Sequence, residues 1–232
     1  MPTINKAAIV TGSATGIGAA TARSLARRGW HVLVNGSKNR EAAEAVAKEC
    51  AEIAAPHGAK VALCMASVAE DAECRRIVDT ALKTFGRLDA LVNNAAITKF
   101  CALDNLDGLE AADFMNLYAV NVVGPFQMIR AAVPALRASG AGSVVNISSN
   151  SAVTGSGSSI AYVASKGALN TMTMSLARVL GPQIRVNGVM PGFTITPWHT
   201  KGMKPETIDF VTEHFRNTTP LKSPTEIGRA HV

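Results

Sequence analysis

Residues 7–18 read AAIVTGSATGIG, in which a short apolar run leads into a turn with three glycines. Glycines at these spacings allow a tight turn, a close approach of the backbone to a pyrophosphate, and close packing of a following helix on the strand. The helix N-terminus adds N–H donors and the positive end of a dipole, which favour an anion. The stretch therefore predicts a dinucleotide-binding turn, although a purely structural glycine turn is the alternative. The expected cofactor contacts of this turn are Gly12, Ser13, Thr15, Gly16, Ile17 and Gly18.

The rest of the chain repeats this alternation of strand and helix. Short apolar runs predict strands that are buried on both faces of a parallel sheet, at 7–10, 32–34, 61–63, 88–92, 144–147 and 184–189. Helical periodicity lies between them, at 19–28, 40–55, 71–85, 113–138 and 162–180. A glycine follows each helix, where a left-handed residue is favoured, at 29, 58, 86, 140 and 181. This pattern predicts an α/β fold with one doubly wound parallel sheet flanked by helices, in a single domain over residues 1–232.

Composition argues against several other classes of protein. The 232 residues are 47% apolar and 17% charged, which suits a globular domain with a sizeable core. No apolar run approaches the roughly 20 residues that span a bilayer, and the N-terminus lacks the pattern of a signal peptide. We therefore expect a cytoplasmic protein that does not contact a membrane.

Charge, cysteines and histidines give no sign of nucleic-acid or metal binding. The net charge is +6, but the cations are scattered and no basic run is interleaved with aromatic residues. The four cysteines and five histidines show no metal-ligand spacing. We expect reduced thiols, no bound metal and no nucleic-acid partner.

Further motifs follow in a fixed order. They are Asn93-Asn94-Ala95-Ala96 after the fourth predicted strand, Asn121 in a long helix, Ser148-Ser149, Tyr162-Val163-Ala164-Ser165-Lys166 and Pro191-Gly192. With Thr11-Gly12-x-x-x-Gly16-x-Gly18, this order resembles the short-chain dehydrogenase/reductase family, and the pattern is most similar to its β-ketoacyl-carrier-protein reductase-like branch. The resemblance implies a Rossmann-type sheet of seven strands. Because the sequence after Pro220 only begins another helix-like stretch at Thr225–Ala230, we expect the last strand to be missing and the domain to be C-terminally incomplete.

Tyr162 and Lys166 stand at i and i+4 of a predicted helix and share one face. A free tyrosine has a pKa near 10, which is too high for efficient proton exchange at neutral pH. An ammonium roughly 4 Å away, at an effective dielectric near 20, attracts the phenolate by about 4 kcal/mol and lowers the pKa of the phenol. We therefore expect Tyr162 to be the general acid/base, and the alternative is a surface pair without chemical function.

The family resemblance assigns the remaining catalytic functions. Lys166 would also hold the nicotinamide ribose hydroxyls, and Ser149 would hydrogen-bond the substrate oxygen as charge develops on it. Strand alternation predicts that the neighbouring Ser148 points elsewhere. Asn121 would anchor a water in the proton relay, while a buried structural amide is the alternative.

The end of the second predicted strand bears on the choice of nicotinamide cofactor. Dinucleotide-binding sheets that prefer NAD usually carry an acid here, but residues 34–40 read VNGSKNR. Gly36 replaces the acid, and Ser37, Lys38 and Arg40 could meet a 2′-phosphate. The sequence favours NADP, with NAD as the alternative. By resemblance, further cofactor contacts come from Ser67, Val68, Asn94, Ala95, Tyr162, Lys166, Pro191, Gly192, Thr194 and Thr196.

The substrate is the least defined part of this prediction. We expect reduction of a carbonyl to an alcohol, or the reverse, on a 3-oxoacyl-like compound or another small ketone, with Pro197–Pro205 as a mobile lid and Trp198 as a pocket wall. Sugars, steroids and aromatic alcohols stay open, and an ordinary surface loop is the alternative to the lid. A catalytically silent dinucleotide-binding or scaffold protein of the same fold is the alternative function, but the set of Asn121, Ser149, Tyr162 and Lys166 argues against it. The resemblance also implies a homodimer or homotetramer through helices 113–138 and 162–180.

Overall fold

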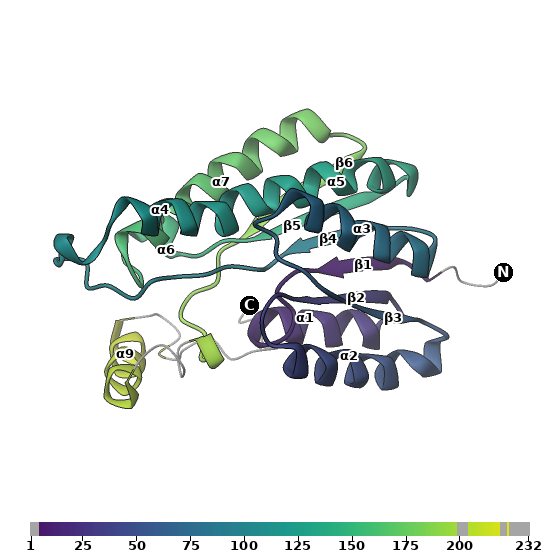
Figure 1. Ribbon diagram of the computed structural model, residues 1–232. Coiled ribbons are helices and arrows are strands. Elements are labelled where there is room, and N and C mark those ends of the chain that lie inside the picture. The colour runs from purple at the N-terminus through teal and green to yellow at the C-terminus, as the bar shows by residue number, and fades with distance from the viewer. Residues whose placement is uncertain (1–4, 199–203, 219–221, 223–232) are drawn as a thin grey trace.

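A parallel sheet lies between two layers of helices in the computed structural model, which describes residues 5–198, 204–218 and 222 (Figure 1). The strands are ordered β3-β2-β1-β4-β5-β6, and every neighbouring pair is parallel. The expected doubly wound sheet is therefore confirmed, with six strands in the described part of the chain. Their bounds are β1 Ala7–Val10, β2 His31–Gly36, β3 Val61–Met65, β4 Ala90–Asn93, β5 Gly142–Ile147 and β6 Ile184–Val189.

The helices follow the strands as crossover connections. Helices α1 and α2 pack on each other on one face of the sheet, and α3 packs on α5 on the other (Figure 1). The α-helices are α1 Gly16–Arg27, α2 Arg40–Ala54, α3 Asp71–Phe85, α4 Ala111–Tyr118, α5 Gly124–Ala138, α6 Ser151–Thr154, α7 Ile160–Leu180 and α9 Pro205–Thr218. Two short 3₁₀ turns, Ala55–His57 and Leu106–Gly108, and a π-helical segment, Ala119–Val123, complete the described elements.

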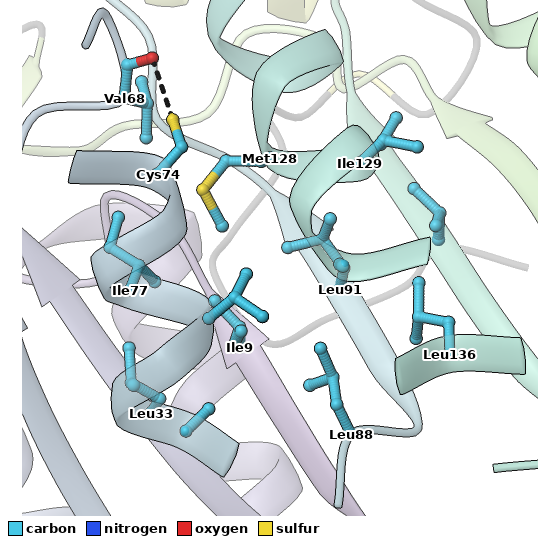
Figure 2. Packing of buried hydrophobic residues seen from close by; sticks show 14 of the residues in the cluster. Ile9, Leu33, Val68, Cys74, Ile77, Leu88, Leu91, Met128, Ile129 and Leu136 are labelled. Atoms are coloured by element: carbon cyan, nitrogen blue, oxygen red, sulfur yellow. Dashed lines mark hydrogen bonds between the residues drawn. The ribbon is translucent and has the colours of Figure 1, made fainter. Parts of the chain in front are cut away.

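The core explains why the strands read as nearly continuous apolar runs. Neighbouring residues of a strand point to opposite faces of the sheet. Ile9 of β1 packs in the cluster beneath α3 and α5 with Ile77 and Met128 (Figure 2), whereas Val10 packs in the cluster beneath α1 and α2. Ala22 of α1 is fully buried in that second cluster, where its small side chain lets the helix lie close to the sheet. Both faces of the sheet are thus buried, as expected.

Four of the five glycines expected to end helices in the left-handed region do so. Gly29, Gly58, Gly86 and Gly140 have φ of 73°, 64°, 74° and 77°. The expectation is wrong for Gly181, which has φ −68° and ψ 154°. Pro182 follows it, and the residue before a proline is driven toward extended backbone, so the helix ends without a left-handed residue.

Two helical features differ from the sequence-based expectation. The segment expected as one helix over 113–138 is α4, a π-helical turn and α5, and it begins at Ala111. Helix α9, Pro205–Thr218, follows the expected lid Pro197–Pro205, and the sequence-based prediction includes no helix there. Residues 199–203 of that lid, and the helix-like stretch Thr225–Ala230, lie outside the described residues.

The helical stretch Ala111–Ala138 meets the length and composition criterion for a membrane span, with 28 residues and a mean hydropathy of 1.2. This corrects the expectation that no segment approaches that length. A large share of the stretch is packed inside the domain, where Met128, Ile129 and Leu136 are buried. Because core helices of soluble proteins meet the same criterion, the finding is weak evidence for a membrane span.

Candidate active site

A cavity of about 750 Å³ lies at the carboxyl ends of the strands, beside the point between β1 and β4 where the strand order reverses. Ligands of open α/β sheets bind at such a crevice. The sequence-predicted residues that line it are Gly12, Thr15, Gly16, Ile17, Ser37, Lys38, Ser67, Val68, Asn94, Ala95, Ser149, Tyr162, Lys166, Pro191, Gly192, Thr194 and Thr196. Of the other predicted site residues, Ser13, Gly18 and Asn121 do not line it.

The three glycines of the first turn have three different surroundings. Gly12 has φ +61°, and a Cβ there would lie 2.7 Å from the Cα of Ala95. A Cβ at Gly18 would lie 2.6 Å from the carbonyl oxygen of Gly12, so this glycine serves close packing. Gly16 has φ +58°, but its Cβ would come no closer than 3.6 Å to Thr196, in the cavity. Only Gly16 keeps ligand space open, which fits the expected division between packing and close approach to a ligand.

The Ser13 side chain lies inside the turn and not in the predicted contact with the cofactor. Its hydroxyl is fully buried, donates to the carbonyl oxygen of Val10 at 2.7 Å and accepts from the amide of Asn35 at 2.9 Å. Ser13 therefore fixes the turn from inside and does not face the ligand space.

Asn35 lines the cavity and ties the turn to the sheet. Its Oδ1 accepts from the Gly12 amide at 3.1 Å, and its Nδ2 donates to the carbonyl oxygens of Cys64 and Ala66 at 3.0 and 3.1 Å. The available signal is the position of Asn35, a polar residue directly after the apolar run Val32-Leu33-Val34.

Asn94 holds the same turn from the other side. Its Nδ2 donates to the carbonyl oxygens of Thr11 and Gly12, both at 3.0 Å. The Thr11 hydroxyl accepts from the amides of Asn94 and Ala95 at 3.0 and 3.1 Å. The two asparagines thus fix the glycine turn from both sides.

The end of β2 presents one of the two expected cations to the cavity. Ser37 and Lys38 are exposed and line it. Arg40 does not line it, and its guanidinium pairs with Glu44 at 3.4 Å on the surface of α2. A Cβ at Gly36 would lie 3.3 Å from the Cβ of Ala43, so the glycine also lets α2 approach the strand closely.

Helix α7 brings Tyr162 and Lys166 to the cavity on one face. The Ser159 hydroxyl caps the helix by accepting from the Tyr162 amide at 3.2 Å. Lys166 Nζ lies 5.7 Å from the centroid of the Tyr162 ring and donates to the carbonyl oxygen of Ile147 at 2.8 Å. The lysine is 2% exposed. The pair therefore lies side by side at the inner wall, as its spacing predicts.

The electrostatics of this pair differ from the expectation. Burial raises the pKa of Tyr162, and hydrogen bonding with Ser149 offsets this only in part. Burial also lowers the pKa of Lys166 to about 8. Burial of both side chains therefore opposes the acidifying effect that an ammonium next to a phenol has. The pKa of Tyr162 is therefore raised overall, whereas its spacing from Lys166 predicts a lowered pKa.

Ser149 has a hydroxyl partner that the sequence analysis missed. Its Oγ lies 3.0 Å from Oγ of Ser151 and accepts from the Ser151 amide at 3.1 Å. Ser148, in contrast, donates to the carbonyl oxygen of Lys166 at 3.2 Å and is held against α7. The two neighbouring hydroxyls thus have different partners, as strand alternation predicts, although both residues line the cavity.

The Asn121 side chain is used entirely inside the protein. It is fully buried in the π-helical segment. Its Oδ1 accepts from the Ile97 amide at 2.9 Å, and its Nδ2 donates to the Ile97 carbonyl oxygen and the Ser165 hydroxyl, both at 3.0 Å. For the side chain, the structural alternative holds, because both amide hydrogens and the oxygen are already engaged.

Aromatic residues also line the cavity. The Trp198 ring lies 6.1 Å from the Tyr162 ring, tilted by 57°, and so forms the expected wall. Phe193 and Phe215 are stacked at 5.2 Å. Val211, His214 and Phe215 bring α9 to the cavity. Apolar residues at 208, 211 and 215 were the signal for this helix, and the sequence analysis did not use it.

No group of three or more His, Cys, Asp or Glu side chains that could hold a metal ion occurs among residues 5–198, 204–218 and 222. All four cysteines are free, and burial raises the pKa of the Cys50 and Cys74 thiols to about 11. These two thiols are therefore core residues that resist ionisation.

The family model described as short chain dehydrogenase matches residues 6–206. The chain is 41% identical over 218 residues to "Granaticin polyketide synthase putative ketoacyl reductase 2" of Streptomyces violaceoruber, covering 93% of this chain and 82% of that one. It is 34% identical over 194 residues to 3-oxoacyl-[acyl-carrier-protein] reductase FabG of Staphylococcus aureus strain Mu50, covering 83% and 76%.

A solved structure shows the same fold. It is described as a short-chain dehydrogenase/reductase from Burkholderia xenovorans, is 39% identical, has a TM-score of 0.85, and is matched over 96% of this chain and 86% of that one. The chain therefore belongs to the short-chain dehydrogenase/reductase family of NAD(P)-using oxidoreductases.

Proposed function

We propose that the protein reduces a small ketone to an alcohol with NADPH, or catalyses the reverse oxidation, with Tyr162 as the general acid/base. One observation carries this proposal. Tyr162, Lys166 and Ser149 line the same cavity as the glycine turn, so a proton donor and a dinucleotide site share one space. Relatives named as ketoacyl reductases support the reducing direction.

The residues at the turn fit a dinucleotide. A Cβ at Gly16 would enter the cavity, while Gly12 and Gly18 are packed, which leaves backbone N–H groups open to a phosphate at the start of α1. Exposed Lys38 at the end of β2 would pair with a 2′-phosphate, and this is the basis for preferring NADP over NAD. Thr194 and Thr196 would meet the carboxamide end. A bound nicotinamide supplies or accepts the hydride.

In the reducing direction, Tyr162 would act as the acid. A phenol is protonated at neutral pH even at its ordinary pKa near 10, which burial raises further, and a protonated phenol is the acid that a developing alkoxide requires. Ser149 donates a second hydrogen bond to the same oxygen. Lys166, whose pKa is about 8, exchanges protons near neutral pH and would resupply Tyr162. A relay through Asn121 would have to use its backbone carbonyl, since its side chain is engaged.

The test follows NADPH oxidation with a panel of neutral and charged ketones. We expect Tyr162→Phe to lower kcat by about 10²–10⁴-fold, which is the usual contribution of a general acid, and to leave NADPH binding intact. Tyr118→Phe is the matched control, because Tyr118 is the only other tyrosine and does not line the cavity. A Tyr162→Phe protein as active as the parent would refute the assignment. Tight NADPH binding by the parent without turnover of any ketone would favour the silent dinucleotide-binding protein.

The homodimer or homotetramer also belongs to this proposal. Met115 of α4, Phe126 of α5, and Met174 and Val179 of α7 are 72%, 42%, 59% and 69% exposed. Helices α4 and α7 contact each other (Figure 1), and exposed apolar side chains of this size favour a protein interface. Light scattering on the eluting protein should give the mass of at least two chains, and a monomer at micromolar concentration would refute this part.

A further inference from the structure

The aromatic residues that line the cavity indicate which substrate it can bind, which membership of the family does not define. We propose that the substrate is a neutral ketone with an aromatic ring next to the reacting carbonyl, and this inference rests on the proposed function. The argument uses the concentration of rings, the placement of charge and the orientation of α9.

Aromatic residues are scarce in this chain but concentrated at the cavity. The sequence has two Trp, two Tyr and seven Phe. Five of these rings line the cavity, namely Phe100, Tyr162, Phe193, Trp198 and Phe215. They come from four separate parts of the chain, so the concentration arises from the fold and not from one aromatic segment.

The rings are paired at geometries that a further ring can extend. Tyr162 and Trp198 are tilted by 57° at 6.1 Å, and Phe193 and Phe215 are stacked at 5.2 Å with 27° between their planes. Aromatic rings favour tilted and offset-stacked neighbours within about 4.5–7 Å. Because Trp198 contacts the ring of the proposed acid, a group next to the carbonyl carbon would meet this aromatic wall.

Few charged side chains occur among the described residues that line the cavity. Among the described residues, the cavity has two lysines: Lys38 at the end of β2 and Lys166, which is 2% exposed. The charged residues of α9 do not line the cavity. His214 is the titratable side chain that α9 contributes. A substrate with a carboxylate or phosphate beside these rings would lose hydration without gaining an ion pair from α9 or from the other described residues next to them.

The orientation of α9 separates two phenylalanines. Phe215 faces the cavity, together with Val211, whereas Phe210 is 73% exposed and does not line it. The two residues therefore form a matched pair on one helix, with one ring positioned to meet the substrate and the other in solvent.

The test compares two ketones of similar size. Acetophenone has a flat aromatic ring next to the carbonyl, and cyclohexyl methyl ketone has a puckered saturated ring there. Phe215→Leu keeps an apolar side chain but removes its ring. We expect this variant to lower the acetophenone-to-cyclohexyl ratio of kcat/KM about three- to tenfold, which corresponds to one aromatic contact. Phe210→Leu should leave the ratio unchanged.

A binding measurement gives a readout besides turnover. Calorimetric titration of acetophenone into NADPH-saturated Tyr162→Phe protein should show affinity at least threefold higher than for cyclohexyl methyl ketone, and 4-acetylbenzoate should bind more weakly than acetophenone.

The outcomes separate this inference from the proposed function. Turnover that depends on Tyr162, with equal Phe215→Leu effects on both ketones, would overturn the aromatic preference and leave the reductase assignment standing. Better binding of 4-acetylbenzoate would overturn the neutral-substrate part. Turnover that does not depend on Tyr162 would overturn the proposed function itself.

Discussion

A methyl group added at Gly12 or at Gly16 should separate the packing of the first turn from its ligand binding. Both glycines have positive φ, 61° and 58°, and an alanine there costs about 1–2 kcal/mol of backbone strain. At Gly12 the new Cβ would also lie 2.7 Å from the Cα of Ala95, and relieving such overpacking costs roughly 1–3 kcal/mol more. At Gly16 the Cβ would only reach ordinary contact with Thr196 at 3.6 Å.

Gly12→Ala should therefore mainly lower the stability of the protein, whereas Gly16→Ala should mainly weaken NADPH binding. For a domain of this size, 1 kcal/mol corresponds to about 2–4 °C in Tm, so Gly12→Ala should lower Tm by roughly 4–20 °C and Gly16→Ala by roughly 2–8 °C. Because the Gly16 methyl group enters the cavity, Gly16→Ala should weaken NADPH binding at least tenfold, about 1.4 kcal/mol.

The assays are differential scanning fluorimetry without ligand and fluorescence titration with NADPH. If Gly16→Ala binds NADPH as tightly as the parent, the turn does not hold the pyrophosphate at that glycine. If Gly12→Ala is as stable as the parent, the close contact with Ala95 does not constrain the turn.

Three further perturbations test the site. Lys38→Ala should raise the KM for NADPH about tenfold with little change for NADH, whereas Arg40→Ala, outside the cavity, should change neither; equal effects on both coenzymes would contradict the 2′-phosphate contact. Ser151→Ala should lower kcat about three- to tenfold through loss of one hydroxyl contact to Ser149, with the Kd for NADPH unchanged; an unchanged kcat would show that the Ser151 hydroxyl does not orient Ser149. The unfolded chain binds the Lys166 proton more tightly than the buried amine does, so the parent's free energy of unfolding should rise with pH from about 8 toward the ordinary lysine pKa of 10.5. Chemical denaturation at pH 7.5–9 should show this rise in the parent protein and not in Lys166→Met. Equal pH dependence of the two proteins would refute the burial of the Lys166 amine as the cause.

The fold could be predicted because its signals are local. The glycine turn between a strand and an alanine-rich helix specifies one βα unit, and the apolar strands repeat it. All six strands begin and end within two residues of their predicted apolar runs, and β1 and β6 coincide with them. Gly181 shows the limit of this reasoning, because the following proline determines its backbone.

The candidate site could be predicted only where spacing along the chain determines contact. Tyr162 and Lys166 share a helical face, so their proximity followed from sequence. Burial sets their pKa values, and burial depends on the assembled domain. The partners of Asn35 and Asn121 lie on segments distant in sequence, and no local pattern identifies such contacts.

Helix α9 contributes no buried residue, although its side chains line the cavity. Substitutions on it therefore cost little folding free energy, in contrast to changes in the sheet or the glycine turn. For enzyme engineering, α9 is the segment on which a library can vary substrate selectivity while the coenzyme site and the proton donor stay intact. For the same reason, the substrate range can diverge in nature through substitutions on α9.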